Sequence, residues 1–157
     1  MVRPSSFRMN EQTAVNNYFQ NSSDLSPASI IQEARLKFDA MVTALRTAGA
    51  NIVVFDEPEN SDTPDALFPN NWISMHRDGR VALYPMYAKN RREERREEVL
   101  ELLEKEGFNI EEIVDYTSAE EEDVFLEGTG SMILDHVNQI AYCALSERAD
   151  EELFIEF

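Results

Sequence analysis

The sequence predicts an α/β fold built from repeated strand–strand–helix–strand modules, written ββαβ. Three observations lead to this prediction. Two segments carry apolar residues at helical spacing, short β-like runs occur in pairs separated by tight turns, and the order of these elements begins to repeat along the chain. The pattern corresponds to two modules and the beginning of a third. The 157 residues fit one domain, and no separate domains are expected.

The first module is represented by a helix and a strand. A helix is predicted over 27–48, with Ser26 as its N-cap and Pro27 at the first helical position, where the missing N–H costs nothing. Gly49 ends the helix and a strand over 51–55 follows. Residues 56–70 contain three prolines and many polar residues, which is typical of a loop. The hairpin of this module would lie partly upstream.

The second module is complete in the sequence. Strands are predicted over 72–76 and 81–86, with the Asp78-Gly79 pair favouring a tight turn between them. A helix over 90–106 is expected to begin at Asn90 as its cap, and a strand over 110–116 follows it. Trp72 is expected in the core.

The third module begins after Ser131. A second hairpin is predicted from strands over 131–135 and 139–144, with its turn at 136–138. Ser146 is the candidate cap of a helix that starts near Ala149 and is cut at Phe157 in mid-pattern. An array that stops there is expected to leave one edge uncovered.

Composition narrows the classes of function. The formal net charge is −17, from 31 acidic and 14 basic residues, and such a surface disfavours binding to nucleic acid. No apolar run is long enough to span a membrane, and the first residues have no apolar signal region, so we expect neither a membrane partner nor secretion. The single cysteine cannot form an internal disulfide. Cytoplasmic localisation is the expectation.

Two short segments are candidates for chemistry. In Phe68-Pro69-Asn70-Asn71-Trp72 two adjacent amides stand where a loop enters a strand, so they can offer donors and acceptors to a ligand or simply form a turn. In Leu126-Glu127-Gly128-Thr129-Gly130-Ser131 a carboxylate stands in a glycine-bearing bend before a strand. Glycine allows a ligand to approach the backbone closely, and it also makes turns.

Other candidates are weaker. His76 and His136 lie near hairpin turns without cysteine or histidine at ligand spacing, so no metal site is predicted. Cys143 lies in an apolar strand, where a free cysteine behaves as a small hydrophobic residue. No cofactor is predicted.

Several segments occur in this order in one family. They are Met1-Val2-Arg3-Pro4, Phe7, Asn10-Glu11-Gln12-Thr13-Ala14, Asn17-Tyr18-Phe19-Gln20, Phe68-Pro69-Asn70-Asn71-Trp72, Tyr84-Pro85-Met86, Leu126-Glu127-Gly128-Thr129-Gly130-Ser131 and Ala141-Tyr142. Over nearly its whole length the chain resembles the amidinotransferase-like branch of the guanidine-modifying superfamily, particularly the citrulline utilisation hydrolases. Members of that family are roughly twice as long, as expected if this chain is the amino-terminal part of one domain.

The resemblance implies a pentein α/β propeller and nucleophilic catalysis. A cysteine thiolate attacks the guanidino or ureido carbon, a histidine moves protons, and carboxylates hold the substrate nitrogens. By motif, Glu127 corresponds to the catalytic carboxylate that contacts substrate nitrogens and the histidine. Asn71 stands where arginine-directed relatives have an aspartate, with Asn70 as the substitute if the register is one residue off. An amide there suits the neutral ureido group of citrulline.

The catalytic histidine and cysteine of the family belong to motifs that this sequence does not contain. The expectation is therefore an amino-terminal fragment of a cysteine-dependent hydrolase that releases ammonia from citrulline or a related ureido or guanidino compound, inactive by itself. Its partners would be that small substrate and either a missing carboxyl-terminal half or a second copy of the chain. An amidinotransferase fragment, an arginine deiminase fragment and a non-catalytic binding module remain alternatives.

Overall fold

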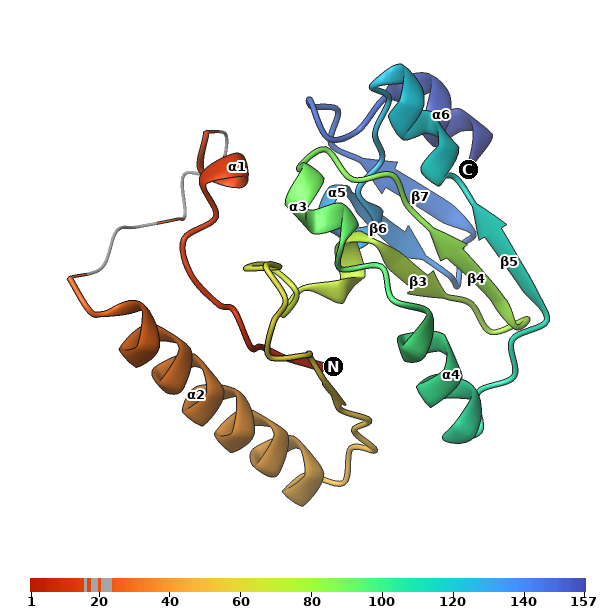
Figure 1. The fold of residues 1–157 in the computed structure, drawn as a ribbon. Helices are drawn as coiled ribbons and strands as arrows, with labels where there is room; N and C mark the ends of the chain where they lie inside the picture. The colour runs from red at the N-terminus through yellow and green to blue at the C-terminus, as the bar shows by residue number, and fades with distance from the viewer. Residues whose placement is uncertain (16, 18–19, 21–23) are drawn as a thin grey trace.

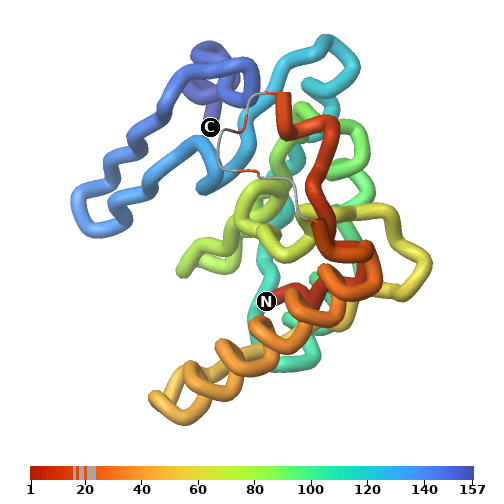
Figure 2. The backbone as a smooth tube through the Cα atoms, turned by 90° about the vertical axis from the view of Figure 1, so that its left-hand side faces the viewer, coloured from red at the N-terminus to blue at the C-terminus, as the bar shows by residue number. Residues whose placement is uncertain are grey.

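The computed structural model describes residues 1–15, 17, 20 and 24–157. They form a mixed α/β structure with three small sheets, in which α2 lies at one side and α6 with the β6–β7 hairpin at the other (Figures 1 and 2). The strands are β1 Val2–Arg3, β2 Phe55–Asp56, β3 Ile73–Met75, β4 Arg80–Leu83, β5 Glu112–Asp115, β6 Met132–Asp135 and β7 Ile140–Cys143. The helices are α1 Glu11–Ala14, α2 Pro27–Thr47, α3 Lys89–Arg92, α4 Glu97–Lys105, α5 Gly128–Ser131 and α6 Glu151–Glu156, with short 3₁₀ helices η1 Pro69–Asn71 and η2 Thr117–Glu122.

The first sheet pairs strand β1, at the amino terminus, with strand β2, which follows α2. Helix α2 begins as predicted, because the Ser26 side chain accepts a hydrogen bond from the Ser29 N–H. Strand β1 pairs in parallel with β2, with Val2 opposite Phe55. The predicted strand over 51–55 is wrong in extent, since regular pairing is confined to Phe55–Asp56, where β1 supplies a neighbour.

The second sheet has the order β3-β4-β5 and follows the predicted strand–strand–helix–strand order. Strands β3 and β4 are antiparallel, and β5 is parallel to β4. Gly79 turns the hairpin with φ +83°, a conformation that glycine adopts without steric cost. Trp72 is buried as expected, at 1 % exposure.

The predicted helix over 90–106 is two helices in the structure. Arg96 adopts an extended conformation (φ −123°, ψ 128°) between α3 and α4 and breaks the hydrogen-bond ladder. Asn90 is not a cap: Ala88 is the N-cap residue of α3, and the Asn90 side chain instead donates to Asn10. The arginines of this segment turn toward different acidic partners, which a single straight helix would not allow.

The third sheet is the predicted β6–β7 hairpin, with Met132 opposite Cys143. Its turn is held by Asp135, whose side chain accepts hydrogen bonds from the Val137 and Asn138 N–H groups. Helix α6 follows, but its N-cap is Asp150 rather than Ser146, because the Asp150 carboxylate accepts from the Leu153 N–H. No complete propeller module is resolved around these sheets in the described part of the chain.

Two buried clusters lie on the two faces of the central sheet. Strand β4 alternates between them: Val81 packs with Trp72, while Ala82 packs with Tyr84 and Leu126. This alternation is the period of two that a strand imposes on its side chains. Leu126 packs on the second of these faces. Because Glu127 follows Leu126 directly in the chain, this packing fixes the position of the Glu127 carboxylate.

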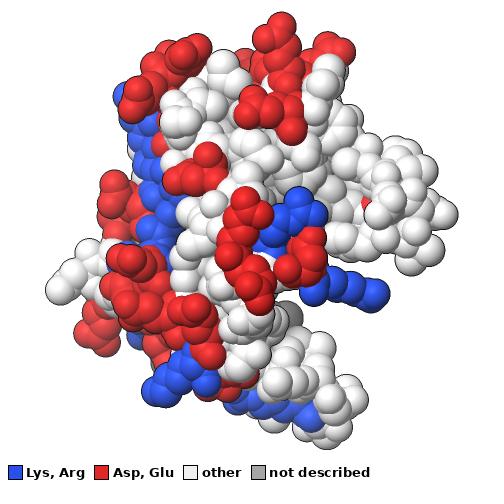
Figure 3. All heavy atoms as spheres, turned by 90° about the vertical axis from the view of Figure 1, so that its right-hand side faces the viewer, with Lys and Arg blue, Asp and Glu red and all other residues white. Residues whose placement is uncertain are grey.

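The surface is predominantly acidic, in line with the net charge of −17. Figure 3 shows acidic groups spread over one face, with basic groups interleaved among them. Among the helices of the described residues, none is both long and apolar enough to cross a bilayer.

Candidate functional site

The structure brings together the two motifs that the sequence analysis singled out. Glu127 is the N-cap residue of α5, and Asn71 ends η1. The Asn71 Nδ2 donates a 3.0 Å hydrogen bond to Glu127 Oε2. Glu127 is buried at 1 % exposure. Residues separated by more than fifty positions thus form one amide–carboxylate contact.

Two glycines allow this contact. A Cβ on Gly128 would lie 2.5 Å from the Asn70 carbonyl oxygen, and one on Gly130 would overlap Asn71 Nδ2. Only residues without a side chain let α5 approach η1 this closely. A bend was expected at this motif, and the structure instead has the short helix α5, which packs on Asn70 and Asn71. Asn70 itself is exposed and contributes its carbonyl oxygen, which accepts from the Thr129 hydroxyl at 3.3 Å.

The Glu127 carboxylate also meets backbone and positive charge. The Tyr87 N–H donates to Oε1 at 3.2 Å. Arg91 Nη1 and Arg148 Nη1 approach Oε2 at 3.8 and 3.6 Å. The main chain of Glu127 is held as well, because its N–H donates to the Arg148 carbonyl oxygen at 3.0 Å. Without such partners a buried carboxylate would carry a large desolvation cost.

Arg91 connects Glu127 to two further carboxylates. Its Nε and Nη2 each donate to Glu94 at 2.9 Å, and Asp65 Oδ2 lies 3.9 Å from its Nε. Burial raises the pKa of Glu94 to about 7, although the two hydrogen bonds from Arg91 act in the opposite direction. We refer to Asp65, Asn71, Arg91, Glu94, Glu127 and Arg148 as the Glu127 cluster.

The amino-terminal segment forms hydrogen bonds with the same cluster. Asn10, fully buried, donates through Nδ2 to Asp65 at 2.7 Å and exchanges side-chain hydrogen bonds with Asn90. The Thr13 hydroxyl donates to Asp65 at 3.2 Å, and Arg148 Nη2 donates to the Thr13 carbonyl oxygen at 3.3 Å. Residues 10–13 therefore hold both Asp65 and Arg148 in place.

Four of these groups were missed as site residues by sequence reasoning, namely Asp65, Arg91, Glu94 and Arg148. Asp65 had a usable signal, since it stands three residues before the Phe68–Trp72 motif. The other three, Arg91, Glu94 and Arg148, each stand beside at least one other charged residue in the sequence. Nothing local distinguished the buried members from the solvated ones.

His76 and His136, which lie near two different hairpin turns in the sequence, are in contact in the structure. Their rings are 5.8 Å apart in an edge-on arrangement, and His76 Nε2 lies 3.0 Å from the Ser74 hydroxyl oxygen. Burial, followed by repulsion from His136, lowers the pKa of His76. Within the described residues, no three histidine, cysteine or acidic side chains gather as ligands for one metal ion.

Cys143 is half-buried in β7, beside the apolar cluster that contains Tyr84 and Leu126. Burial raises the pKa of its thiol, which disfavours the nucleophilic thiolate form. Its environment agrees with the prediction of a small hydrophobic residue in a strand.

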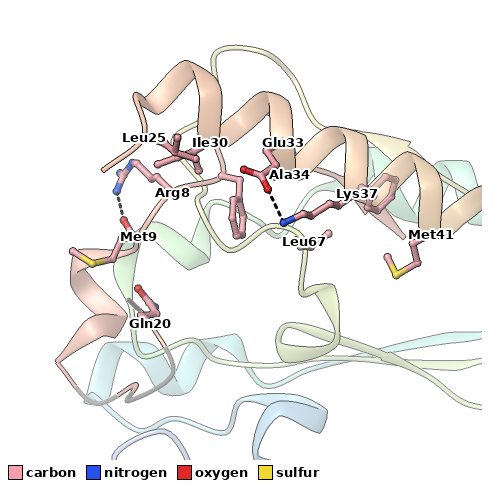
Figure 4. A pocket seen from close by; sticks show the side chains of 12 residues that line it. Arg8, Met9, Gln20, Leu25, Ile30, Glu33, Ala34, Lys37, Met41 and Leu67 are labelled. Carbon is pink, nitrogen blue, oxygen red and sulfur yellow. Dashed lines mark hydrogen bonds and ion pairs between the residues drawn. The ribbon is translucent and has the colours of Figure 1, made fainter. Parts of the chain in front are cut away.

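An apolar cavity lies elsewhere, along α2. It has a volume of about 540 Å³ and is bordered by α2, the segment around Phe7 and Leu67 (Figure 4). The Glu33–Lys37 ion pair, 2.7 Å long, lies at this cavity. None of the side chains that line the cavity belongs to the Glu127 cluster.

The chemistry available at the Glu127 cluster is recognition of nitrogen-bearing groups. Carboxylates accept N–H bonds and stabilise positive charge, and Asn71 offers one acceptor and two donors. Among the described residues, no cysteine or histidine side chain forms a hydrogen bond or ion pair with Glu127. The cluster offers hydrogen-bond donors and acceptors but does not itself contain a nucleophile paired with a base.

Comparison with known proteins agrees with this chemistry at the level of the superfamily. A family model described as N,N dimethylarginine dimethylhydrolase, eukaryotic, matches residues 3–157. No curated protein matches the chain significantly. The match supports the guanidine-modifying superfamily expected from the motifs, but it does not support the citrulline hydrolase branch. The family consists of hydrolases that cleave a guanidino C–N bond of methylated arginines. Because the match spans nearly the entire sequence, the chain belongs to the eukaryotic N,N dimethylarginine dimethylhydrolase family.

Proposed function

We propose that the Glu127 cluster binds the guanidino or ureido group of a small amino-acid substrate in a cysteine-dependent hydrolase. The observation that carries the proposal is the buried contact between Asn71 and Glu127, which come from two distant motifs. In this proposal the Glu127 carboxylate accepts N–H bonds from the substrate. Asn71, with Asn70 beside it in the chain, lies along the substrate-binding side.

A methylated arginine is the first candidate substrate. The family match points to it, and the cluster has three carboxylates against two guanidinium groups, an excess that favours a cationic ligand. Citrulline is the second candidate, because Asn71 provides an amide where a second carboxylate would repel the ureido oxygen. The reaction would release dimethylamine from the first substrate and ammonia from the second.

The covalent step needs a thiolate and a histidine beside the substrate carbon. We propose that they come from sequence outside these 157 residues, either a carboxyl-terminal half of the same enzyme or a partner chain. Residues 1–157 would then be the amino-terminal part of a single pentein propeller domain in the cytoplasm, without a cofactor. A non-catalytic binding module remains an alternative, and it would bind the same ligands with no turnover when the second half is supplied.

The test is calorimetric titration of the 157-residue chain with N,N-dimethylarginine, arginine and citrulline. Glu127→Gln should weaken binding of the preferred ligand about tenfold to a hundredfold, because a buried charge-assisted hydrogen bond is worth about 1.5–3 kcal/mol. Asn138→Ala, in the exposed turn of the β6–β7 hairpin, is the matched control and should leave binding unchanged.

Asn71→Asp separates the two candidate substrates. The added carboxylate should weaken citrulline binding, since it presents an acceptor to the ureido oxygen. Unchanged citrulline affinity in Asn71→Asp, or unchanged affinity for every ligand in Glu127→Gln, would contradict the proposed role of the cluster.

A further inference from the structure

Arg91 is surrounded by carboxylates from three parts of the chain. Glu94 lies two residues past the end of α3, Asp65 comes from the loop before η1, and Glu127 caps α5. The Arg91 side chain is 4 % exposed and that of Glu94 is 0 % exposed. These charges are therefore screened little by solvent and interact strongly with one another.

The charges of the Glu127 cluster do not balance when every group is ionised. Asp65, Glu94 and Glu127 contribute three negative charges, and Arg91 and Arg148 contribute two positive ones. One negative charge is left in excess in a largely buried place, which is costly. The excess can be removed by one proton or by one bound cation.

Two neighbouring arginines among the described residues are paired outside the cluster. Arg92 and Arg95 turn toward Glu120, at 3.4 and 2.5 Å, and Glu120 accepts the Met86 N–H. The groups that face Glu94 are Arg91 on α3, Asp65 from the preceding loop and Glu127 from α5. Glu94 has the most buried side chain of the three, at 0 % exposure against 14 % for Asp65 and 1 % for Glu127, and this burial raises its pKa to about 7. The proton is therefore assigned to Glu94.

We propose that Glu94 is a specificity-determining residue that exchanges a proton for a cationic ligand. In the free protein near neutral pH, the excess charge is neutralised by a proton on the Glu94 carboxylate. When a guanidinium group binds beside Asn71 and Glu127, it supplies the missing positive charge and Glu94 releases its proton to solvent. A neutral ureido ligand leaves the proton in place. This inference rests on the proposed function of the same cluster.

The experiment is calorimetric titration at pH 6 in two buffers with different ionisation enthalpies. N,N-dimethylarginine and citrulline form a matched pair, because they share the amino-acid end and differ in the charge of the reacting group. Binding of N,N-dimethylarginine should release up to one proton, and its affinity should rise by at most about tenfold per pH unit between pH 5.5 and 7. Binding of citrulline should release no proton.

Substitutions assign the proton to Glu94. Glu94→Gln should abolish both the proton release and the pH dependence, whereas Glu94→Asp keeps a titrating carboxylate and should retain them. Glu101→Gln, on the exposed side of α4, is the control and should behave as the unchanged chain. Proton release that persists in Glu94→Gln, or equal release with citrulline, would overturn the inference.

A ligand-free measurement separates this inference from the proposed function. The pKa of Glu94 is raised in the folded state, so its contribution to stability is present below about pH 4.5 and is lost as the pH rises through about 7. The free energy of unfolding of the unchanged chain should therefore fall across this window relative to Glu94→Gln. Parallel pH profiles of the two proteins would overturn the role of Glu94, whichever ligands bind. A chain that shows the expected profile but binds neither ligand would instead overturn the proposed function and the ligand exchange with it.

Discussion

Gly128 and Gly130 determine how closely the glutamate motif can approach the asparagine motif. Gly128 has φ +24° and faces the Asn70 and Asn71 carbonyl oxygens. Gly130 faces the side-chain nitrogen of Asn71. A backbone oxygen cannot move without shifting η1, whereas the end of a side chain can rotate away. The two positions should therefore differ in how they tolerate a methyl group.

Gly128→Ala should destabilise the chain more than Gly130→Ala. The first change forces backbone atoms apart at a strained φ and should cost about 1–3 kcal/mol. The second should displace the Asn71 amide and cost about 1 kcal/mol, the net value of one hydrogen bond. Urea denaturation of both variants measures the difference, and the reverse order of stability would contradict this account of the contact.

At the scale of elements, short helices in this chain depend on their first residues. Helix α6 begins at Glu151, and the Asp150 carboxylate accepts from the Leu153 N–H at 3.0 Å. The helix presents Leu153 to the cluster around Tyr84 and Leu126. Loss of the cap therefore also loosens one side of the core.

Asp150→Ala should lower the free energy of unfolding by about 1 kcal/mol, and Asp150→Asn should restore most of it, because asparagine is an equally good N-cap. Ser146→Ala should change stability by less than about 0.5 kcal/mol, as for other surface substitutions. Thermal unfolding of the three variants is the measurement. A larger loss in Ser146→Ala than in Asp150→Ala would show that the helix is capped differently.

Elements with a strong local signal could be predicted from the sequence. The cap and apolar stripe of α2, the Asp78-Gly79 turn and the pairing of β6 with β7 all depend on nearby residues. The division between α3 and α4 could not be predicted, because Arg91 and Arg95 turn to acidic partners 25 to 36 positions away, Asp65, Glu120 and Glu127 among them. The same holds for strand β2, whose extent depends on a partner strand at the amino terminus.

At the scale of the whole molecule, the amino-terminal segment holds distant parts of the chain together. Asn10 links to Asp65 and Asn90, and Ser5 donates to the buried carboxylate of Glu57 through its N–H at 2.6 Å and its hydroxyl at 2.8 Å. These bonds span 52 to 80 positions. The segment thus acts as a strap across the loop before η1 and the start of α3.

Asn10→Ala should destabilise the whole chain by about 1–3 kcal/mol, because it leaves buried partners of the amide unsatisfied. It should also weaken ligand binding, since Asp65 loses the 2.7 Å bond that orients it. Asn138→Ala, on an exposed turn, should change stability by less than about 0.5 kcal/mol. Denaturant unfolding and ligand titration check both effects, and equal stability of the two variants would contradict the role of the strap.

Part of the site could be anticipated from motifs and part could not. The segments of Asn71 and Glu127 stood out by their amides, carboxylate and glycines, but the roles expected of these two residues came from the resemblance to the guanidine-modifying superfamily. Arg91, Glu94 and Arg148 became recognisable only through burial and mutual contact, which arise from packing of α3, α5 and the segment before α6. The sequence alone does not distinguish a charged residue that is buried from one that is exposed to solvent.

The scattered origin of the partners of Glu127 has a consequence for the order of folding. The carboxylate is satisfied by groups at positions 71, 87 and 91 before it and 148 after it, and the Thr13 carbonyl oxygen of the strap accepts a hydrogen bond from Arg148. Contacts of such high sequence separation carry a large loop-closure cost and form late, after the local hairpins and α2. During synthesis the Glu127 carboxylate would therefore remain hydrated until Arg148 has left the ribosome. The Glu127 cluster would be the last part of the molecule to reach its native structure.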